Sequence, residues 1–388
     1  MSSLRTPWRG VAAAFMLNGL LLGAWASRIP AIMERHSLSE ATLGILLLVL
    51  GLGAVVSFPV AGRLSDDFGA VRLTRLLAVI SLVMLVMIGL APTPILLGAA
   101  LLVFGMGFGA MDVTMNSWAT EVEKTLGRPV MSSFHAMWSL GTALGAGSGY
   151  VAASIGLPVG LHFLLAALAA ALILGPFTLI PWESRRRGRG APGPVFALPR
   201  GQLVLVGVLA LSAGLSEGAM ADWSAVYLRD VIGAGEARAT LGYAVFSVTM
   251  VAMRLCVDRL VLRFGPVRMA RISGAAVLCG LALLVIPATM TAALIGFVLM
   301  GLGCAALIPL AFSRAAADPD VPPGQAIAAV ATLGYGAMLL GPPAIGFIAE
   351  IFSLRLSFAL LSVFAAMVVA LAPILAQSGR STAGDASG

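Results

Sequence analysis

Apolar residues dominate this chain in long runs that short polar segments interrupt. A helix needs about 20 apolar residues to cross the ~30 Å hydrocarbon core of a bilayer, and segments of this kind recur twelve times along the sequence. The predicted spans cover roughly residues 8–32, 41–62, 73–91, 94–117, 131–154, 157–182, 201–228, 239–258, 270–288, 291–313, 325–349 and 354–376. The pattern therefore predicts an all-α integral membrane protein with twelve transmembrane helices.

The two halves of the chain repeat each other. The segment FGAVRLTRL at 68–76 returns as FGPVRMARI at 264–272, and the string ATLG at 41–44 returns at 239–242. Six spans per half is an even number, so both halves enter the membrane in the same orientation and form a parallel pseudo-two-fold repeat. We expect two six-helix bundles, at 1–182 and 201–376. A cytoplasmic linker over 183–200 joins them, and a disordered cytoplasmic tail covers 377–388.

Composition and charge placement support this topology. The chain is 60% hydrophobic and only 11% charged, with a net charge of +7, which excludes a water-soluble globule. With both termini in the cytoplasm, 19 of the 24 Lys and Arg residues fall on the cytoplasmic side, as the positive-inside rule requires. The basic charge is thus a topology signal in a multi-pass protein of the cell inner membrane. It does not indicate a nucleic-acid partner.

The loop after the second predicted span carries a motif. Residues 62–69 read GRLSDDFG, which resembles the G-x-L-x-D-x-x-G loop of the major facilitator superfamily. The resemblance implies that this loop and its counterpart in the second half latch the halves together on the cytoplasmic side. A solvated loop carboxylate is the alternative for Asp66. The implied gate residues are Gly62, Asp66, Gly69, Arg72, Arg254, Asp258 and Arg268.

A finer resemblance lies in the fourth span. The stretch GMGFGAMDVTMN at 105–116 is similar to the G-x-G-x-G-x-x-E-x-x-x-N stretch of fucose-permease-like sugar/proton symporters. It places Asp112 where that group has a proton-coupled Glu, and Asn116 at its Asn. The acidic residue of that group's first helix has no counterpart here, because Arg28 occupies this part of the first span.

Ionisable side chains inside the spans are the candidates for coupling. Each costs at least ~2.5–3.5 kcal/mol to insert, so it should face protein or water. Asp112 and Glu217 are the expected proton-coupling residues. For Asp112 the alternative is a fixed buried ion pair, or an acceptor of N–H hydrogen bonds that only holds helices together. Arg28 and Glu217 are candidates for a pair between the halves, or for a cation and an anion that grip a polar substrate. We expect Asp222 to lie near the outer surface, in solvent.

Polar and aromatic residues predicted to face the centre are the candidate substrate contacts. For His135 a hydrogen bond to a carbonyl is an equal alternative, and for the aromatic residues core packing is the alternative. In the eleventh span Pro342 and Pro343 predict a bend. The candidate contacts are Asn18, Trp25, Arg28, Asn116, His135, Trp138 and Tyr335.

These observations predict a secondary active transporter that works by alternating access. The sequence has no G-x-x-x-x-G-K-[ST] phosphate loop, so an ion gradient rather than ATP should supply the energy. The three histidines are scattered and the three cysteines lack paired spacing, so neither an enzyme, a metal site nor a cofactor is expected. Proton-coupled uptake of a small polar solute such as a sugar competes with proton-coupled export of drugs or amphipathic metabolites. The expected partners are the solute, protons and the lipid bilayer, and the expected working unit is a monomer.

Overall fold

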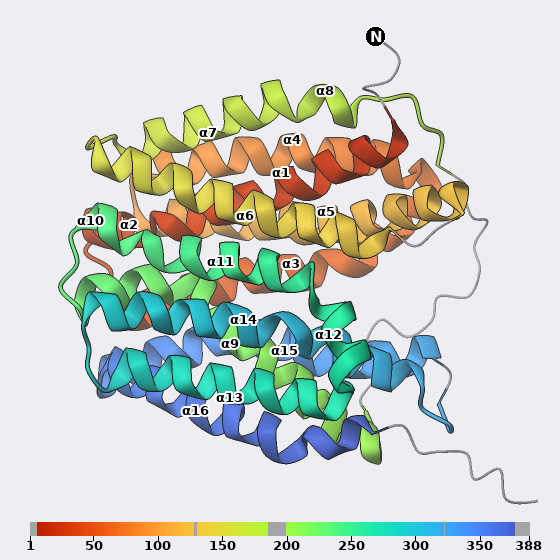
Figure 1. Cartoon of the computed structure of the whole chain (residues 1–388). Coiled ribbons are helices and arrows are strands. Elements are labelled where there is room, and N and C mark those ends of the chain that lie inside the picture. The colour runs from red at the N-terminus through yellow and green to blue at the C-terminus, as the bar shows by residue number, and fades with distance from the viewer. Residues whose placement is uncertain (1–5, 128–129, 185–198, 322, 377–388) are drawn as a thin grey trace, which may run out of the picture.

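The computed structural model describes residues 6–127, 130–184, 199–321 and 323–376, and helices make up almost all of these ranges (Figure 1). The N-terminal half contains α1 (Pro7–Ser27), α2 (Ile29–His36), α3 (Glu40–Phe68), α4 (Ala70–Leu90), α5 (Pro94–Leu126), α6 (Met131–Ser154), α7 (Val159–Ile173) and α8 (Gly175–Thr178). The C-terminal half contains α9 (Gln202–Asp230), α10 (Glu236–Ala239), α11 (Leu241–Arg254), α12 (Val257–Phe264), α13 (Pro266–Val285), α14 (Met290–Ala316), α15 (Pro323–Ile351), α16 (Leu354–Leu371) and the 3₁₀ turn η2 (Ala372–Leu375). Most of the expected linker and the expected tail lie outside the described residues, and the domain boundaries remain predictions.

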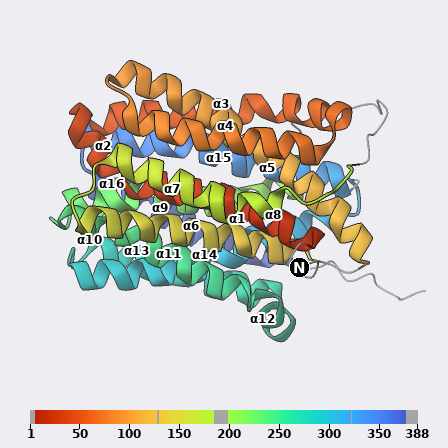
Figure 2. The ribbon, with the colours of Figure 1, turned by 90° about the horizontal axis from the view of Figure 1, so that it is seen from above.

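The twelve expected spans correspond to twelve of these helices. Within the described residues, nine helices are long and apolar enough to cross a membrane. The three other expected spans correspond to α6, α7 and α11. The first is rich in Gly and Ser, and the other two have 15 and 14 residues. Figures 1 and 2 show the long helices running side by side, with α2 and α10 at one end of the molecule and α8 and α12 at the other.

The halves repeat the same packing. In the first half α1 packs on α6, α3 on α5, and α4 on both α5 and α7. In the second half α9 packs on α15, α11 on α14, and α13 on both α14 and α16. Each of these contacts joins elements at equivalent places in the two halves, so the duplication seen in the sequence is a duplication of the bundle.

Local structure carries the repeat as well. Gly69 and Gly265 stand at equivalent turns, before α4 and α13, with φ of +88° and +78°. This left-handed region is where a residue without a Cβ is favoured. The helices α5 and α14 both begin after a threonine cap, and Thr93 and Thr289 accept from the backbone N–H groups of Leu96 and Ala292. Such a cap satisfies one of the free N–H groups of the first turn.

Glycines bring α1 and α6 into backbone contact. A Cβ atom added to Gly19 would lie 2.1 Å from the carbonyl oxygen of Trp138, and one added to Gly141 would lie 2.1 Å from that of Met16. Gly23 and Gly145 repeat the arrangement further along the two helices. Since glycine alone permits this approach, α1 and α6 form one closely joined pair.

The halves meet along two seams, formed by α3 with α15 and by α6 with α11. These seams join equivalent pairs of helices, so they follow the same pseudo-symmetry as the bundles. In the first seam Gly44 of α3 lies against the backbone of Pro343, and a Cβ added there would be 3.0 Å from the Pro343 Cα. Pro342 and Pro343 both lie inside α15, which is helical from Pro323 to Ile351.

Candidate functional site

A cavity of about 220 Å³ lies between the two halves. Its walls come from α1, α3, α5 and α6 of the first half and from α9 and α15 of the second. Most of the lining is apolar, as with Leu47 and Phe58 of α3 and Leu339 and Pro342 of α15. We call this space the central cavity.

Two carboxyl groups enter the central cavity, one from each half. Asp112 projects from α5 and Asp222 from α9, and they are the only ionisable residues among the described residues that line it. The expectation that Asp222 lies in solvent near the outer surface was wrong. The helix α9 continues for eight more residues to Asp230, about 12 Å at 1.5 Å per residue, so Asp222 lies well inside the span. Its carboxyl group has no hydrogen-bond or ion-pair partner in the described part of the chain.

Asp112 is held by its own helix. The Asn116 side-chain amide donates to the Asp112 carbonyl oxygen over 2.9 Å and to its Oδ1 over 3.2 Å. Asn116 therefore orients the carboxyl group, and no Lys or Arg of the described chain forms an ion pair with Asp112. The ion pair of the alternative is thus absent among the described residues, whereas an N–H acceptor is present, with its donor on the same helix. The coupling role of Asp112 remains a prediction.

An aromatic wall lies beside these carboxyl groups. The Trp138 indole N–H donates to Asn18 Oδ1 over 2.9 Å, while the Asn18 amide donates to the Phe108 carbonyl oxygen over 3.3 Å. Trp138 and Phe108 line the central cavity, whereas Asn18 is completely buried behind them. Asn18, a candidate substrate contact, instead fixes the orientation of Trp138.

Glu217 takes part in a separate polar bridge. Its Oε2 lies 3.5 Å from Nη2 of Arg254, and Nη1 of Arg254 donates to the Ser139 hydroxyl of α6 over 2.9 Å. Arg254 therefore joins α9 and α11 to a helix of the opposite half. Glu217 is not among the lining residues of the central cavity, so its coupling role remains a prediction. The Ser139 hydroxyl in turn donates to the His135 carbonyl oxygen over 3.2 Å.

Arg28 also pairs across the two halves, but its partner is not the expected Glu217. Its Nη2 lies 3.0 Å from Glu236 Oε1 of α10 and donates to the Leu157 carbonyl oxygen over 2.9 Å. The physical reason is depth. Arg28 follows the last residue of α1, while Glu217 lies 13 residues before the end of α9, about 20 Å from it.

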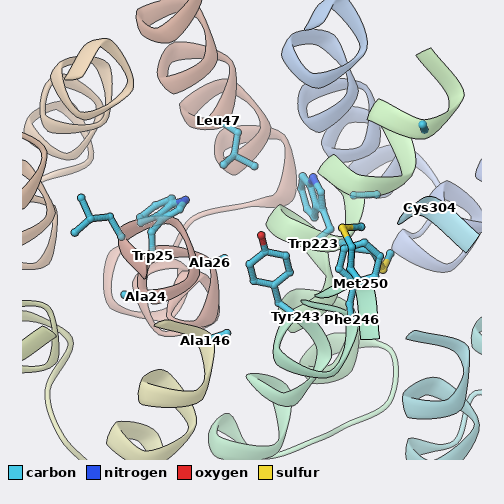
Figure 3. Close-up of a cluster of buried hydrophobic side chains, with 14 of the residues drawn as sticks. Ala24, Trp25, Ala26, Leu47, Ala146, Trp223, Tyr243, Phe246, Met250 and Cys304 are labelled. Atoms are coloured by element: carbon cyan, nitrogen blue, oxygen red, sulfur yellow. The ribbon is translucent and has the colours of Figure 1, made fainter. Parts of the chain in front are cut away.

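The remaining aromatic and histidine candidates differ in their surroundings. Trp25 is completely buried in the core, where Figure 3 shows it in one cluster with Leu47 of its own half and with Trp223 and Tyr243 of the other. It is not a lining residue of the central cavity. The His135 ring is exposed and meets Phe15 edge-on, with 5.2 Å between the ring centroids. The side chain of Tyr335 lies outside the described part of the structure.

Of the expected gate residues, Arg254 is the one in the described set that hydrogen-bonds to the opposite half. Arg72 and Arg268 are exposed, Gly69 forms the turn before α4, and Gly62 lies inside α3. The side chains of Asp66 and Asp258 lie outside the described part of the structure, so the latch remains a prediction.

Three contributing residues were missed at the sequence level. Asp222 lines the central cavity, Glu236 is the partner of Arg28, and Arg229 donates to the Pro30 carbonyl oxygen of the opposite half over 2.6 Å. Asp222 alone gave a usable signal, because it is an acid inside a predicted span. The other two lie at a helix end, where charged residues are common and carry little information.

Comparison with known proteins decides the family. A sequence profile described as Major Facilitator Superfamily matches residues 10–323. The chain belongs to the Major Facilitator Superfamily. It is accordingly a multi-pass membrane transporter of that superfamily rather than an enzyme.

Curated relatives of this superfamily member are similar over nearly its whole length. It is 55% identical to the uncharacterized transporter y4wD of Sinorhizobium fredii, over 97% of this chain and 100% of that one. It is 34% identical to the membrane protein MosC of Rhizobium meliloti, over 96% of this chain and 90% of that one.

Solved structures agree on the major facilitator fold. A point mutant of the nucleoside transporter NupG superposes with a TM-score of 0.75 at 13% identity, covering 95% of this chain and 99% of that one. A bacterial homologue of the human lysosomal transporter Spinster, inward-facing and occupied, gives 0.69 at 16% identity, with 94% and 95% covered. Identities this low show the fold alone. The finer resemblance to fucose-permease-like symporters remains a prediction.

Proposed function

We propose that this protein is a proton-coupled secondary transporter that carries a small amphipathic solute through the central cavity. The observation that supports this is that Asp112 and Asp222 reach the same cavity from opposite halves. A carboxyl group in apolar surroundings is tolerated at low cost only when it is protonated or paired with a cation. Two such groups without a countercharge among the described lining residues suit repeated protonation and release.

Alternating access follows from the arrangement of the halves. Contacts at the α2–α10 end join them, through Arg28 with Glu236 and Arg229 with the Pro30 carbonyl. The distribution of basic residues supports an orientation in which this end faces outward and both termini are cytoplasmic. Opening of this end and closure of the α8–α12 end would expose the central cavity to the other side. One chain supplies both walls of the cavity, which supports a monomer as the working unit.

The proton gradient is sufficient as an energy source. One proton that moves down ~100 mV gains ~2.3 kcal/mol. Each ~1.4 kcal/mol corresponds to a tenfold ratio, so one proton per solute supports accumulation of roughly 50-fold.

Uptake of a sugar-like solute is the second candidate. The likeness of residues 105–116 to sugar/proton symporters supports it. Sugar recognition needs several hydrogen-bonding side chains, however, and the apolar residues that α3 and α15 contribute to the central cavity offer few. The lining therefore favours an amphipathic solute.

The test combines ligand screening with transport. Sugars, amino acids and amphipathic compounds are screened for thermal stabilisation of the purified protein, and hits are followed in proteoliposomes under an imposed proton gradient. We expect Asp112→Asn to abolish gradient-driven accumulation while solute exchange remains measurable. Asp320→Asn, which alters an exposed carboxylate after α14, serves as the control. Undiminished accumulation in Asp112→Asn would remove that residue from the coupling role.

A further inference from the structure

The charge balance of the central cavity restricts what can bind there. Asp112 and Asp222 supply two potential negative charges, and no Lys, Arg or His lies among the described lining residues. The Arg254 guanidinium, which lies between the halves, is already engaged by Glu217 and Ser139. An anionic solute would find no complementary charge, whereas a cation would find two acceptors.

The remaining walls suit an organic cation rather than an inorganic one. Trp138, Phe108 and Phe58 present aromatic surface to the central cavity, and an aromatic face attracts a cation within about 6 Å of its centroid. Trp138 is locked in place by Asn18, so its ring is presented without a further loss of conformational freedom. The volume of about 220 Å³ lies below the ~300–1,000 Å³ that is typical of sites for drug-sized ligands, which favours a small solute.

We propose that the central cavity binds a small organic cation, an amine or quaternary ammonium group on an apolar body, and that this cation and protons exclude each other at Asp112 and Asp222. The inference rests on the proposed function and deepens it. A cation that binds displaces protons from the carboxyl groups, and protons that return displace the cation. Binding both would leave net positive charge in an apolar space, which is costly.

Mutual exclusion makes the protein an exchanger. Protons that enter from the outside neutralise Asp112 and Asp222 and are released to the inside as the cation binds there. The inward proton gradient therefore expels the cation from the cell, with up to two protons per cation because there are two carboxyl groups.

The groups that surround Asp112 and Asp222 leave these two carboxyl groups as the ones that exchange protons for the cation. Asn116, which holds Asp112, carries no charge. From neighbouring α11 the titratable group that interacts electrostatically with Asp222 is the Tyr243 phenol. On α9 itself Glu217 is paired with Arg254, and this pair is not part of the cavity wall.

Quaternary ammonium probes test the proposal, because their fixed charge prevents them from carrying protons across lipid by themselves. The purified full chain is placed in proteoliposomes that contain a pH-sensitive dye. A gradient of tetramethylammonium, benzyltrimethylammonium or 3-phenylpropyl-trimethylammonium is then imposed. The comparison probes are 3-phenylpropanesulfonate, which is an anion, and methyl glucoside, which is neutral. We expect at least one ammonium probe, and neither comparison probe, to drive protons in the opposite direction.

Variants connect this flux to the two carboxyl groups. Asp222→Asn should roughly halve the number of protons moved per cation and weaken probe binding about tenfold or more, whereas Asp222→Glu should retain both. Asp320→Asn is the matched control, and thermal unfolding in detergent confirms that each variant is folded. A folded Asp222→Asn protein with unchanged stoichiometry and affinity would overturn the assignment.

The outcomes separate this inference from the proposed function. Proton movement together with methyl glucoside or the sulfonate, without any response to the ammonium probes, would overturn the cation assignment and leave a proton-coupled carrier. Absence of proton flux with all five probes would overturn the cation assignment, and the proposed function would then depend on the screen described above.

Discussion

The guanidinium group of Arg28 is paired with the carboxylate of Glu236 across the boundary between the two halves, with 3.0 Å between Nη2 and Oε1. The partners differ in environment, since the Arg28 side chain is 3% exposed and that of Glu236 44%. Nε and Nη1 of Arg28 have no hydrogen-bond partner among the described residues. Glu236 is therefore a large part of what keeps this buried cation tolerable.

Loss of the Glu236 carboxylate should loosen the α2–α10 end. In Glu236→Gln the buried Arg28 charge loses its counter-ion, which costs more than the loss of an exposed pair does. We expect a cysteine placed at Ala54, in the wall of the central cavity, to react several-fold faster with a membrane-impermeant thiol reagent from that side. Glu34→Gln, which changes an exposed carboxylate of α2, is the control. Equal labelling rates in both proteins would argue against a closing role for the pair.

Arg254 should matter most when Glu217 is present. Arg254→Gln leaves the Glu217 carboxylate without its cation, which is destabilising for a group inside a helix bundle. The double variant Glu217→Gln/Arg254→Gln removes both charges and should unfold at a higher temperature than Arg254→Gln alone. Thermal unfolding in detergent measures this coupling. Additive effects of the two substitutions would mean that the pair contributes nothing.

Asn18 should act through Trp138. In Asn18→Ala the indole N–H loses its acceptor, and a buried donor without a partner costs about 1–3 kcal/mol. In a Trp138→Phe background no such donor exists, so the same change at Asn18 should cost less. A double-mutant cycle on the free energy of unfolding provides the test. The prediction fails if Asn18→Ala is equally destabilising in both backgrounds.

Two glycines of α6 offer a matched comparison. A Cβ at Gly141 would overlap the carbonyl oxygen of Met16 at 2.1 Å, whereas a Cβ at Gly147 would have no atom within 4 Å. Gly141→Ala should therefore destabilise the protein by roughly 1–3 kcal/mol through overpacking. Gly147→Ala should be neutral or stabilising by up to ~1 kcal/mol, from helix propensity. Similar unfolding temperatures for the two variants would show that α1 and α6 are not in tight contact.

The sequence was most informative about features that depend only on the local stretch of chain, such as the positions of helices and turns. Hydropathy located the helices because contact with lipid depends on the length and polarity of each segment. The repeat located equivalent turns, as Gly69 and Gly265 show, because identical local geometry needs similar local residues. Both kinds of information are local in the chain.

Side-chain partners on different helices were harder to predict, because a contact requires both residues to lie at the same depth in the membrane and on facing sides of their helices. Arg28 and Glu217 face the interior, but about 20 Å of helix separates their depths, so each found another partner. Asp222 was misplaced for a related reason: the end of α9 was predicted to within two residues, at 228 against Asp230, but about 12 Å of helix separates Asp222 from that end, so its side chain lies at the depth of the cavity and not in solvent. The carbonyl acceptors of Arg28 and Arg229 carry no sequence signal at all.

The backbone contact between α1 and α6 has a mechanical consequence. Because Gly19 and Gly141 bring the two backbones into contact, neither helix can slide along the other without a steric clash. The two helices therefore move as one rigid unit. Arg28, at one end of this unit, pairs with Glu236 of the other half. Ser139, further along the unit, accepts a hydrogen bond from Arg254 of the other half. A tilt that breaks the first contact must shift the second. The glycine contacts between α1 and α6 thus couple the Arg28–Glu236 contact at one face of the membrane to the Arg254–Ser139 contact nearer the other face.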